Sequence, residues 1–256
     1  MQTNHIFNED CRITLERDIE FNLVITSPPY NHGLCKSKSV QVGILYDEYH
    51  DDKTNDEYVK FTLDVFNKLE KHLKKNGVIL YNFNYGTKTV DNAILMYDVV
   101  NAINHMTNMC VVDTITWIKR NCLAINSSLN KLTRKNEFIF VISRKSEFNS
   151  FYANRIQKSI SKNGLKKYDT FYNLIQAKNN DTTTDVNKAT FSSEMVLKLL
   201  NFYARPLRDF VVYDPFMGTG TTAYAARQYG CSYLGSEISE TQVKYALNRL
   251  RMCEDW

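Results

Sequence analysis

Residues 210–226, FVVYDPFMGTGTTAYAA, restrict the fold of this chain more than any other stretch. An apolar run ends in Asp214, a turn with Gly218 and Gly220 follows, and a helix-forming segment begins at once. A strand, a glycine-rich turn and a helix in this order are typical of a sheet edge where a cofactor approaches the backbone. The spacing is not the G-x-G-x-x-G of dinucleotide sites, and no Gly-Lys-Ser/Thr of a triphosphate loop is present. The stretch therefore predicts a cofactor site that does not hold a triphosphate.

A second apolar segment, residues 232–238, carries an acid at its end. Glu237 lies roughly 20 residues beyond Gly218, where the acid of such a β-α-β unit accepts hydrogen bonds from ribose hydroxyls. A tight structural turn followed by an unrelated surface glutamate is the alternative. The glycines and the acid together favour a site for a nucleotide-like cofactor.

Strand and helix patterns alternate along most of the chain. A capping box, Thr54-x-x-Glu57, predicts the start of a helix, and Gly77 stands where its C-cap is expected. Further helices are predicted at 90–105, 192–204 and 220–229 and after Ser239, and strands at 21–26, 78–83, 111–118, 137–142, 210–214 and 232–238. Strands that alternate with helices indicate a doubly wound, mostly parallel α/β sheet.

Residues 144–188 interrupt this alternation. They contain nine Lys or Arg and four acidic residues, interspersed with aromatic side chains such as Tyr168. A solvated loop with basic side chains would have the same composition. We interpret the chain as one domain whose halves, 1–143 and 188–256, are separated by an insertion at 144–187.

The composition of the whole chain excludes several classes of protein. Over its 256 residues the formal net charge is +4, which permits a nucleic-acid partner without requiring one. No apolar run reaches the roughly 20 residues that span a bilayer, and no basic and apolar leader is present. We therefore expect a cytoplasmic protein. The six cysteines form no C-x-x-C pair and the five histidines no H-x-x-x-H, so neither a metal site nor disulfides are expected.

Residues 25–31, ITSPPYN, form a stiff polar corner where the first predicted strand ends. If that strand joins the same parallel sheet, Ser27 and the residues after it border the cofactor site. Proline fixes φ and has no backbone N–H to donate, so two prolines in a row make a stiff turn and leave carbonyl oxygens without local partners. Such an oxygen is able to accept a hydrogen bond from an amino group. Tyr30 offers a flat face for stacking a base. A strand-ending turn with Tyr30 packed in the core is the structural alternative.

TSPPY (26–30) and DPFMGTGTT (214–222), in this order, resemble the signature pair of S-adenosylmethionine-dependent DNA amino-methyltransferases. The order with the catalytic motif first is that of the β group of this family. NEDCRI (8–13) resembles the element whose acid meets the adenine of the cofactor, and YLGSEIS (233–239) resembles the segment whose acid holds the ribose. The resemblance implies a Rossmann-like methyltransferase sheet.

Three further segments support the resemblance. TWIKRN (116–121) and RKNEFIFVISRK (134–145) match the paired strands that flank the recognition region. NKATFSSEMVLKLL (187–200) loosely resembles the lead-in and helix that contact the methionine part, although it lacks the usual "HP" opening. The resemblance covers nearly all of the chain outside about 145–186, and it makes 144–187 the candidate target-recognition region.

The family's mechanism implies a role for each residue of the corner. Hydrogen bonds from an exocyclic amino group to the Ser27 hydroxyl and the Pro28 carbonyl would return its lone pair to nitrogen, which attacks the sulfonium methyl. Pro29 stiffens the corner, and Tyr30 would stack on a flipped base. Ser27 is expected only to orient the amino group, with proton loss to water. The cofactor-binding residues implied by the match are Asp10, Cys11, Thr26, Asp214, Pro215, Phe216, Gly218, Gly220, Thr221, Thr222 and Glu237, with Thr190 and Ser192 from the loosely matching segment.

The resemblance also implies the substrate. Ser27 in the first motif position favours N4 of cytosine, with N6 of adenine as the alternative; no Pro-Cys pair for ring-carbon methylation is present. Double-stranded DNA is the expected partner, within a restriction-modification system that includes a companion endonuclease, and a homodimer is expected from the β group. The rival interpretations are an RNA or protein amino-methyltransferase and a non-catalytic DNA-binding subunit.

Overall fold

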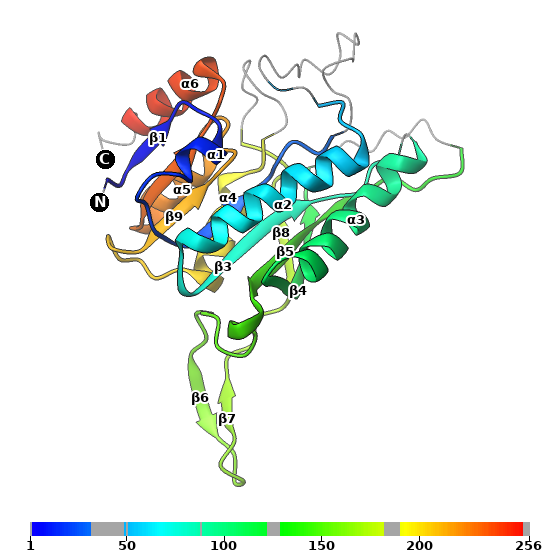
Figure 1. The fold of residues 1–256 in the computed structure, drawn as a ribbon. Helices are drawn as coiled ribbons and strands as arrows, with labels where there is room; N and C mark the ends of the chain where they lie inside the picture. The colour runs from blue at the N-terminus through cyan, green and yellow to red at the C-terminus, as the bar shows by residue number, and fades with distance from the viewer. Residues whose placement is uncertain are drawn as a thin grey trace.

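The computed structural model describes residues 2–31, 49, 51–87, 89–121, 129–181 and 190–252, which fold around an eight-stranded sheet (Figure 1). Its strand order is β1-β10-β9-β2-β3-β5-β4-β8, and β6 and β7 form a separate two-stranded sheet. The strands are β1 (His5–Phe7), β2 (Phe21–Thr26), β3 (Leu73–Phe83), β4 (Met109–Lys119), β5 (Asn136–Arg144), β6 (Gln157–Ile160), β7 (Lys166–Tyr168), β8 (Leu174–Ala177), β9 (Val211–Asp214) and β10 (Ser232–Ser236). The helices are α1 (Cys11–Thr14), α2 (Asn55–His72), α3 (Val90–Met106), the 3-10 turn η2 (Lys145–Glu147), α4 (Ser193–Tyr203), α5 (Thr221–Tyr229) and α6 (Glu240–Arg251).

The large sheet is mostly parallel, as predicted. Among its described strands only β5 runs against its neighbours, since it pairs antiparallel with both β3 and β4. β2 and β9 lie side by side and parallel, with Leu23 opposite Val212 and Val24 opposite Tyr213. The two halves of the chain therefore meet at the centre of one sheet. The carboxyl ends of β2 and β9 lie at the same edge, where open α/β sheets bind their ligands.

Helices cover both faces of this sheet (Figure 1). Buried side chains of α1, α2 and α3 form one core with one face, and those of α4, α5 and α6 form a second core with the other. Successive residues of β2 alternate between them: Leu23 and Ile25 join the α4–α6 core, and Val24 joins the α1–α3 core. A strand buried on both faces reads as a continuous apolar run. This explains why FNLVIT lacks a polar alternation.

The predicted C-cap at Gly77 is wrong. α2 begins at the predicted capping box, where the Thr54 hydroxyl accepts from the Glu57 N–H and the Glu57 carboxylate accepts from the Thr54 N–H. It ends at His72, however, and β3 follows without a loop, so Gly77 lies inside a strand. The register between β2 and β3 shifts just before this point, and a Cβ on Gly77 would lie 2.7 Å from the Asn22 carbonyl oxygen. The glycine permits this close strand approach instead of ending a helix.

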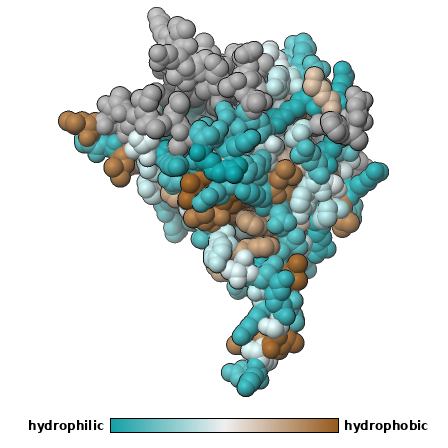
Figure 2. All heavy atoms as spheres, turned by 180° about the vertical axis from the view of Figure 1, so that it is seen from behind, coloured by the Kyte–Doolittle hydropathy of each residue, from teal (hydrophilic) through white to brown (hydrophobic). Residues whose placement is uncertain are grey.

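The structure divides the predicted insertion at 144–187 into parts with different positions. The β6–β7 hairpin projects away from the body (Figures 1 and 2). The segment before it is anchored at the amino edge of the sheet, where the Tyr152 N–H donates to the Asn76 carbonyl (2.8 Å) and the Asn154 N–H to the Phe202 carbonyl (2.7 Å). β8 instead joins the large sheet beside β4. Residues 182–189 lie outside the described part of the chain.

The hairpin itself has no core. All residues of β6 and β7 are exposed, including Ile160 at 60%. It leaves the edge of the sheet opposite to the carboxyl ends of β2 and β9 (Figure 1).

No helix in the described ranges is both long enough and apolar enough to cross a membrane.

Candidate active site

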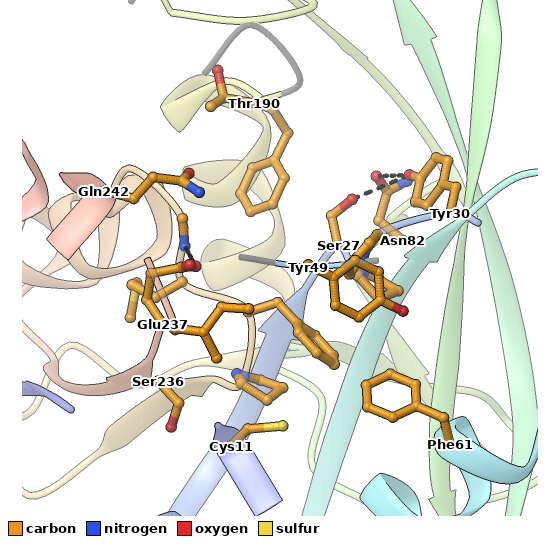
Figure 3. Close-up of a pocket in the computed structure, with 18 of the residues that line it drawn as sticks. Cys11, Ser27, Tyr30, Tyr49, Phe61, Asn82, Thr190, Ser236, Glu237 and Gln242 are labelled. Carbon is orange, nitrogen blue, oxygen red and sulfur yellow. Dashed lines mark hydrogen bonds between the residues drawn. The ribbon is translucent and has the colours of Figure 1, made fainter. Parts of the chain in front are cut away.

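A cavity of about 1180 Å³ opens at the carboxyl edge of the large sheet. Its wall combines the residues after β2, β9 and β10, the start of α1, the ends of β3 and β4 and the start of β5 (Figure 3). Pockets for a single small molecule usually measure about 300–1,000 Å³. The cavity therefore has room for two ligand groups side by side.

One half of the cavity contains most of the predicted cofactor residues. Asp10, Cys11, Pro215, Phe216, Gly218, Thr221 and Glu237 all line it, and so does Thr190. The Glu237 carboxylate is held by two backbone donors, the Gly218 N–H at 2.8 Å and the Ser239 N–H at 2.9 Å. These bonds fix the acid at the end of β10 against the glycine turn after β9.

Asp10 and Cys11 form the wall of this half at the start of α1. The Asp10 carboxylate caps the helix by accepting from the Arg12 N–H (2.8 Å), and it is paired with the Arg12 guanidinium. Burial raises the pKa of the Cys11 thiol far above its ordinary range, so the side chain is a neutral apolar surface. The sequence match had assigned Asp10 to the adenine of the cofactor, with the Cys11 backbone nearby.

Asp214 lies behind the cavity wall and ties the two halves of the chain together. One carboxylate oxygen accepts from the Thr26 hydroxyl (2.7 Å) and from the Phe216 N–H (3.0 Å), and the other accepts from the Thr222 hydroxyl (2.7 Å). Burial raises the pKa of Asp214 to about 6 despite these bonds. The group connects the strand before the TSPPY corner to the strand before the glycine turn, so it sets the spacing of the two motifs.

Two other predicted residues also support the site from behind. Gly220 has φ +79°, and a Cβ there would lie 2.7 Å from the Ala246 Cβ, so the glycine lets α5 begin close to α6. Ser192 caps α4: its hydroxyl accepts from the Met195 N–H and donates to the Lys178 carbonyl at 2.7 Å. Of the predicted cofactor residues, those that support the wall without lining it are Thr26, Ser192, Asp214, Gly220 and Thr222.

The predicted corner forms the other half of the cavity. Ser27, Pro28, Pro29 and Tyr30 all line it. The Ser27 hydroxyl donates to the Tyr30 hydroxyl over 3.2 Å (Figure 3). The Pro29 carbonyl accepts from the buried Tyr58 hydroxyl at 2.6 Å, so a buried helix side chain fixes the turn from below. The Tyr30 ring packs edge-on against Phe83, with ring centroids 5.1 Å apart.

The sequence reasoning missed a polar group beside the corner. The Tyr30 hydroxyl has two acceptors within reach, the side-chain amide oxygen of Asn82 at 2.8 Å and a Glu137 carboxylate oxygen at 3.2 Å. Lys119 donates to the other Glu137 oxygen at 2.5 Å. Asn82, Lys119 and Glu137 all line the cavity. Lys119 and Glu137 belong to the TWIKRN and RKNEF segments, which the sequence match identified only as flanking strands.

Two buried polar atoms of the cavity wall have no hydrogen-bond partner among the described residues. They are the Thr219 hydroxyl, in the glycine turn, and the Trp117 indole N–H, on the side of the corner. Buried polar groups are almost always paired in native proteins. One such atom in each half of the cavity fits a site whose partners are supplied by bound ligands.

A comparison of the sequence with known families agrees with this site. The sequence profile of the DNA methylase family (N6_N4_Mtase) matches residues 21–248, a range that includes both the TSPPY corner and the glycine turn. The chain belongs to this family.

No cluster of three or more His, Cys, Asp or Glu able to hold a metal occurs in the described ranges of the methylase.

Curated relatives of this DNA methylase are Type II methyltransferases. M.BglII of Bacillus subtilis is 24% identical over 264 residues, which cover 95% of this chain and 68% of that protein. M.SmaI of Serratia marcescens is 24% identical, with 90% of this chain and 84% of that protein covered. M.Cfr9I of Citrobacter freundii is 28% identical over 137 residues, a match that spans less than half of that protein, 43%.

Solved structures share the fold of the methylase. PvuII DNA methyltransferase (cytosine-N4-specific) superposes with a TM-score of 0.72 at 16% identity, covering 97% of this chain and 86% of that one. A DNA modification methylase from Thermus thermophilus, solved with S-adenosyl-L-methionine, superposes with a TM-score of 0.63 at 16% identity, covering 96% and 92% of the two chains. These similarities confirm the predicted fold class.

S-adenosylmethionine is the cofactor of this methylase, and the cavity fits it. The fixed Glu237 carboxylate is able to accept from ribose hydroxyls, and Phe216 offers an aromatic surface beside it. The Thr219 hydroxyl adds a donor that has no described protein partner. Together these groups give this side of the cavity a charged acceptor, an aromatic surface and a hydroxyl donor, which suit a cofactor with ribose hydroxyls, a flat base and a polar tail.

Proposed function

We propose that this methylase transfers the methyl group of S-adenosylmethionine to N4 of a cytosine flipped out of duplex DNA. The carrying observation is that the Ser27–Tyr30 corner and the Glu237–glycine-turn unit line one cavity, on strands that the Thr26–Asp214 bond holds together. A structure that shares the fold, PvuII DNA methyltransferase (cytosine-N4-specific), and the serine of the motif both favour cytosine over adenine.

The corner residues would activate the amino group. An exocyclic amino nitrogen is a weak nucleophile because its lone pair is conjugated into the ring. When one N–H donates to the Ser27 hydroxyl oxygen and the other to the Pro28 carbonyl, the nitrogen becomes pyramidal and recovers its lone pair. The bound cofactor supplies an electrophilic methyl on a sulfonium. The lone pair of the amino nitrogen would form the new N–C bond, and the electron pair of the broken C–S bond would stay on sulfur.

The duplex would lie over the carboxyl edge of the sheet. Cations on this side of the molecule include Lys53, Lys60 and Arg134, which line the cavity and suit contacts with phosphates. The hairpin at the opposite edge does not face this surface. We therefore assign target reading to the parts of the 144–187 region near the cavity, such as Asn179, and to the segment before β5.

The biological setting is part of the proposal. The four curated relatives named by the comparison are Type II methyltransferases. This supports a role in protecting DNA against a companion endonuclease, as the sequence resemblance implied. The homodimer expected from the β group stays a prediction.

Methyl-labelled cofactor tests the substrate class. Purified protein is offered duplex DNA, structured RNA and a protein mixture, and label should enter only the DNA. Ser27→Ala should lower transfer about 100-fold while cofactor binding persists. Ser150→Ala, which removes a hydroxyl bonded to Asn76 at the far edge of the sheet, is the matched control and should keep full activity. A preference for RNA would overturn the proposal, and tight DNA binding without any transfer would favour a non-catalytic subunit.

A further inference from the structure

Three side chains of the cavity form a continuous path from the amino-group clamp to a carboxylate. The Ser27 hydroxyl donates to the Tyr30 hydroxyl (3.2 Å), which lies 3.2 Å from a Glu137 carboxylate oxygen, its hydrogen-bond acceptor. Figure 3 shows the Ser27 and Tyr30 hydroxyls turned toward each other. The Tyr30 hydroxyl is able to donate either to Glu137 or to the Asn82 amide oxygen. When its proton points to Glu137, donation runs from serine to tyrosine to glutamate, and a proton that arrived at Ser27 would leave along this path.

The carboxylate at the end of this path is held in place by the sheet. Glu137 is the second residue of β5 and lies opposite Trp117 of the neighbouring antiparallel β4, so Lys119, two residues further along β4, shares its face. The Lys119 ammonium bonds Glu137 at 2.5 Å, with side chains 17% and 12% exposed, and it lies 4.8 Å from the centre of the Trp117 ring. Both partners are mostly shielded from water, which strengthens such a charge-assisted bond.

Asn82 gives the tyrosine a second acceptor. Its amide nitrogen donates to the Phe138 carbonyl (3.1 Å), which directs its oxygen at the Tyr30 hydroxyl (2.8 Å). A phenol has one proton and donates to one acceptor at a time. An amide oxygen is too weak a base to take the proton, whereas a carboxylate does so readily. Asn82 therefore positions Tyr30 between turnovers, and Glu137 offers the place where a proton stays.

We propose that Glu137 takes the proton released in methyl transfer, through Tyr30 and Ser27. This rests on the proposed function. As the N–CH3 bond forms, the amino proton moves to the Ser27 oxygen, the Ser27 proton to the Tyr30 oxygen, and the Tyr30 proton to Glu137. The electron pair of the broken N–H bond stays on nitrogen, so the product base is neutral. The Glu137 carboxylate becomes a carboxylic acid. The proton later returns to water through the cavity, which Glu137 lines.

The relay gives the methylase what Ser27 lacks. A serine hydroxyl is not a base near neutral pH, and a motif that begins with serine provides only a hydrogen-bond acceptor. A carboxylate two hydrogen bonds away supplies the missing base without placing a second charge against the sulfonium. Glu137 touches neither the base nor the cofactor in this scheme, and it acts entirely through the two hydroxyls.

Single-turnover methyl transfer to unmodified plasmid DNA tests the relay. Glu137→Gln keeps the size and an acceptor oxygen but removes the base, so the rate constant should fall about 100-fold. The Kd for S-adenosylmethionine should stay within about twofold of the wild-type value. Glu137→Asp should recover part of the rate. Tyr30→Phe should lose as much as Glu137→Gln, and the double variant should lose little more, because either change breaks the same path.

Glu147→Gln is the matched control. Glu147 is also 12% exposed and ion-paired, with Arg144 at 3.2 Å, but it lies after β5 at the opposite edge of the sheet. Glu147→Gln should leave the rate constant of methyl transfer unchanged. It should lower the unfolding free energy by about as much as Glu137→Gln does. The relay is wrong if Glu137→Gln keeps the wild-type rate, or if rate and cofactor affinity fall together with stability. Absence of transfer by the wild-type protein would instead refute the proposed function.

Discussion

Asp214→Asn provides a quantitative test of how the two motifs are held together. The Asp214 carboxylate is fully buried between Thr26 and Thr222, and its pKa is raised from 3.8 to about 6 because burial penalises the charge. One pKa unit corresponds to about 1.4 kcal/mol, so ionising this group in the folded protein costs about 3 kcal/mol relative to the unfolded chain. Asparagine has no charge to bury and keeps a side-chain oxygen for one threonine.

The sign of the pH dependence follows from the raised pKa. Between about pH 4 and pH 6 the folded protein keeps a proton on Asp214 that the unfolded chain has already lost. The contribution of this group to stability is therefore complete below pH 4, falls as pH rises through about 6, and is constant above. The difference in unfolding free energy, variant minus wild type, should grow by about 3 kcal/mol from pH 4 to pH 7.

Urea unfolding at several pH values between 4 and 7 measures this difference. Asp209→Asn is the matched control, because Asp209 is an exposed aspartate just before β9. The substitution removes the same charge as Asp214→Asn does. Its difference from wild type should not follow this pH course. A flat difference for Asp214→Asn, or one that shrinks as pH rises, would show that the Asp214 bonds stabilise its charge fully and would refute the reasoning.

Three further predictions address the cofactor half and the hairpin. Gly220→Ala should lower the unfolding free energy by about 2–4 kcal/mol in urea titrations, since φ is +79° and the new Cβ would lie 2.7 Å from the Ala246 Cβ; a loss below about 0.5 kcal/mol would contradict this packing. Glu237→Gln should raise the Kd for S-adenosylmethionine about 10- to 100-fold by calorimetry, because a charged acceptor of the ribose is lost; an unchanged Kd would remove Glu237 from the site. A variant with alanine at all four hairpin lysines should keep DNA affinity and transfer rate within about twofold of wild type in filter-binding and labelling assays. A tenfold loss would place DNA on the hairpin side. The four residues are Lys158, Lys162, Lys166 and Lys167.

Much of the fold could be predicted because it depends on local patterns. FNLVIT, the Thr54–Glu57 capping box and the strand–turn–helix at 210–226 each encode their element within a few residues, and each forms as predicted. One physical rule, that parallel strands bring their carboxyl ends to the same edge, predicted that both strands end at one edge, although it did not predict that β2 and β9 are direct neighbours. That rule was enough to bring TSPPY and DPFMGTGTT into one cavity.

The errors and omissions all involve partners that are distant along the chain. Gly77 has the local signature of a cap, but the Asn22 carbonyl of another strand determines its role. β8 is a short segment that becomes a strand by pairing with β4. The Lys119–Glu137 pair depends on the antiparallel register of β4 and β5, which no spacing within a single sequence fixes. Basic composition, likewise, marked residues 144–187 as one candidate recognition region without showing that β8 joins the large sheet while β6 and β7 form a separate one.

The central claim is that the corner at Ser27 and the glycine turn together methylate an amino nitrogen of DNA. Duplex DNA incubated with the protein and isotope-labelled S-adenosylmethionine, digested to nucleosides and analysed by mass spectrometry, tests it most directly. We predict labelled N4-methylcytosine, absent from a parallel incubation with Ser27→Ala. Labelled N6-methyladenine alone would correct the target base and leave the amino-group clamp intact. Label at a ring carbon, or no labelled nucleoside at all, would contradict the account.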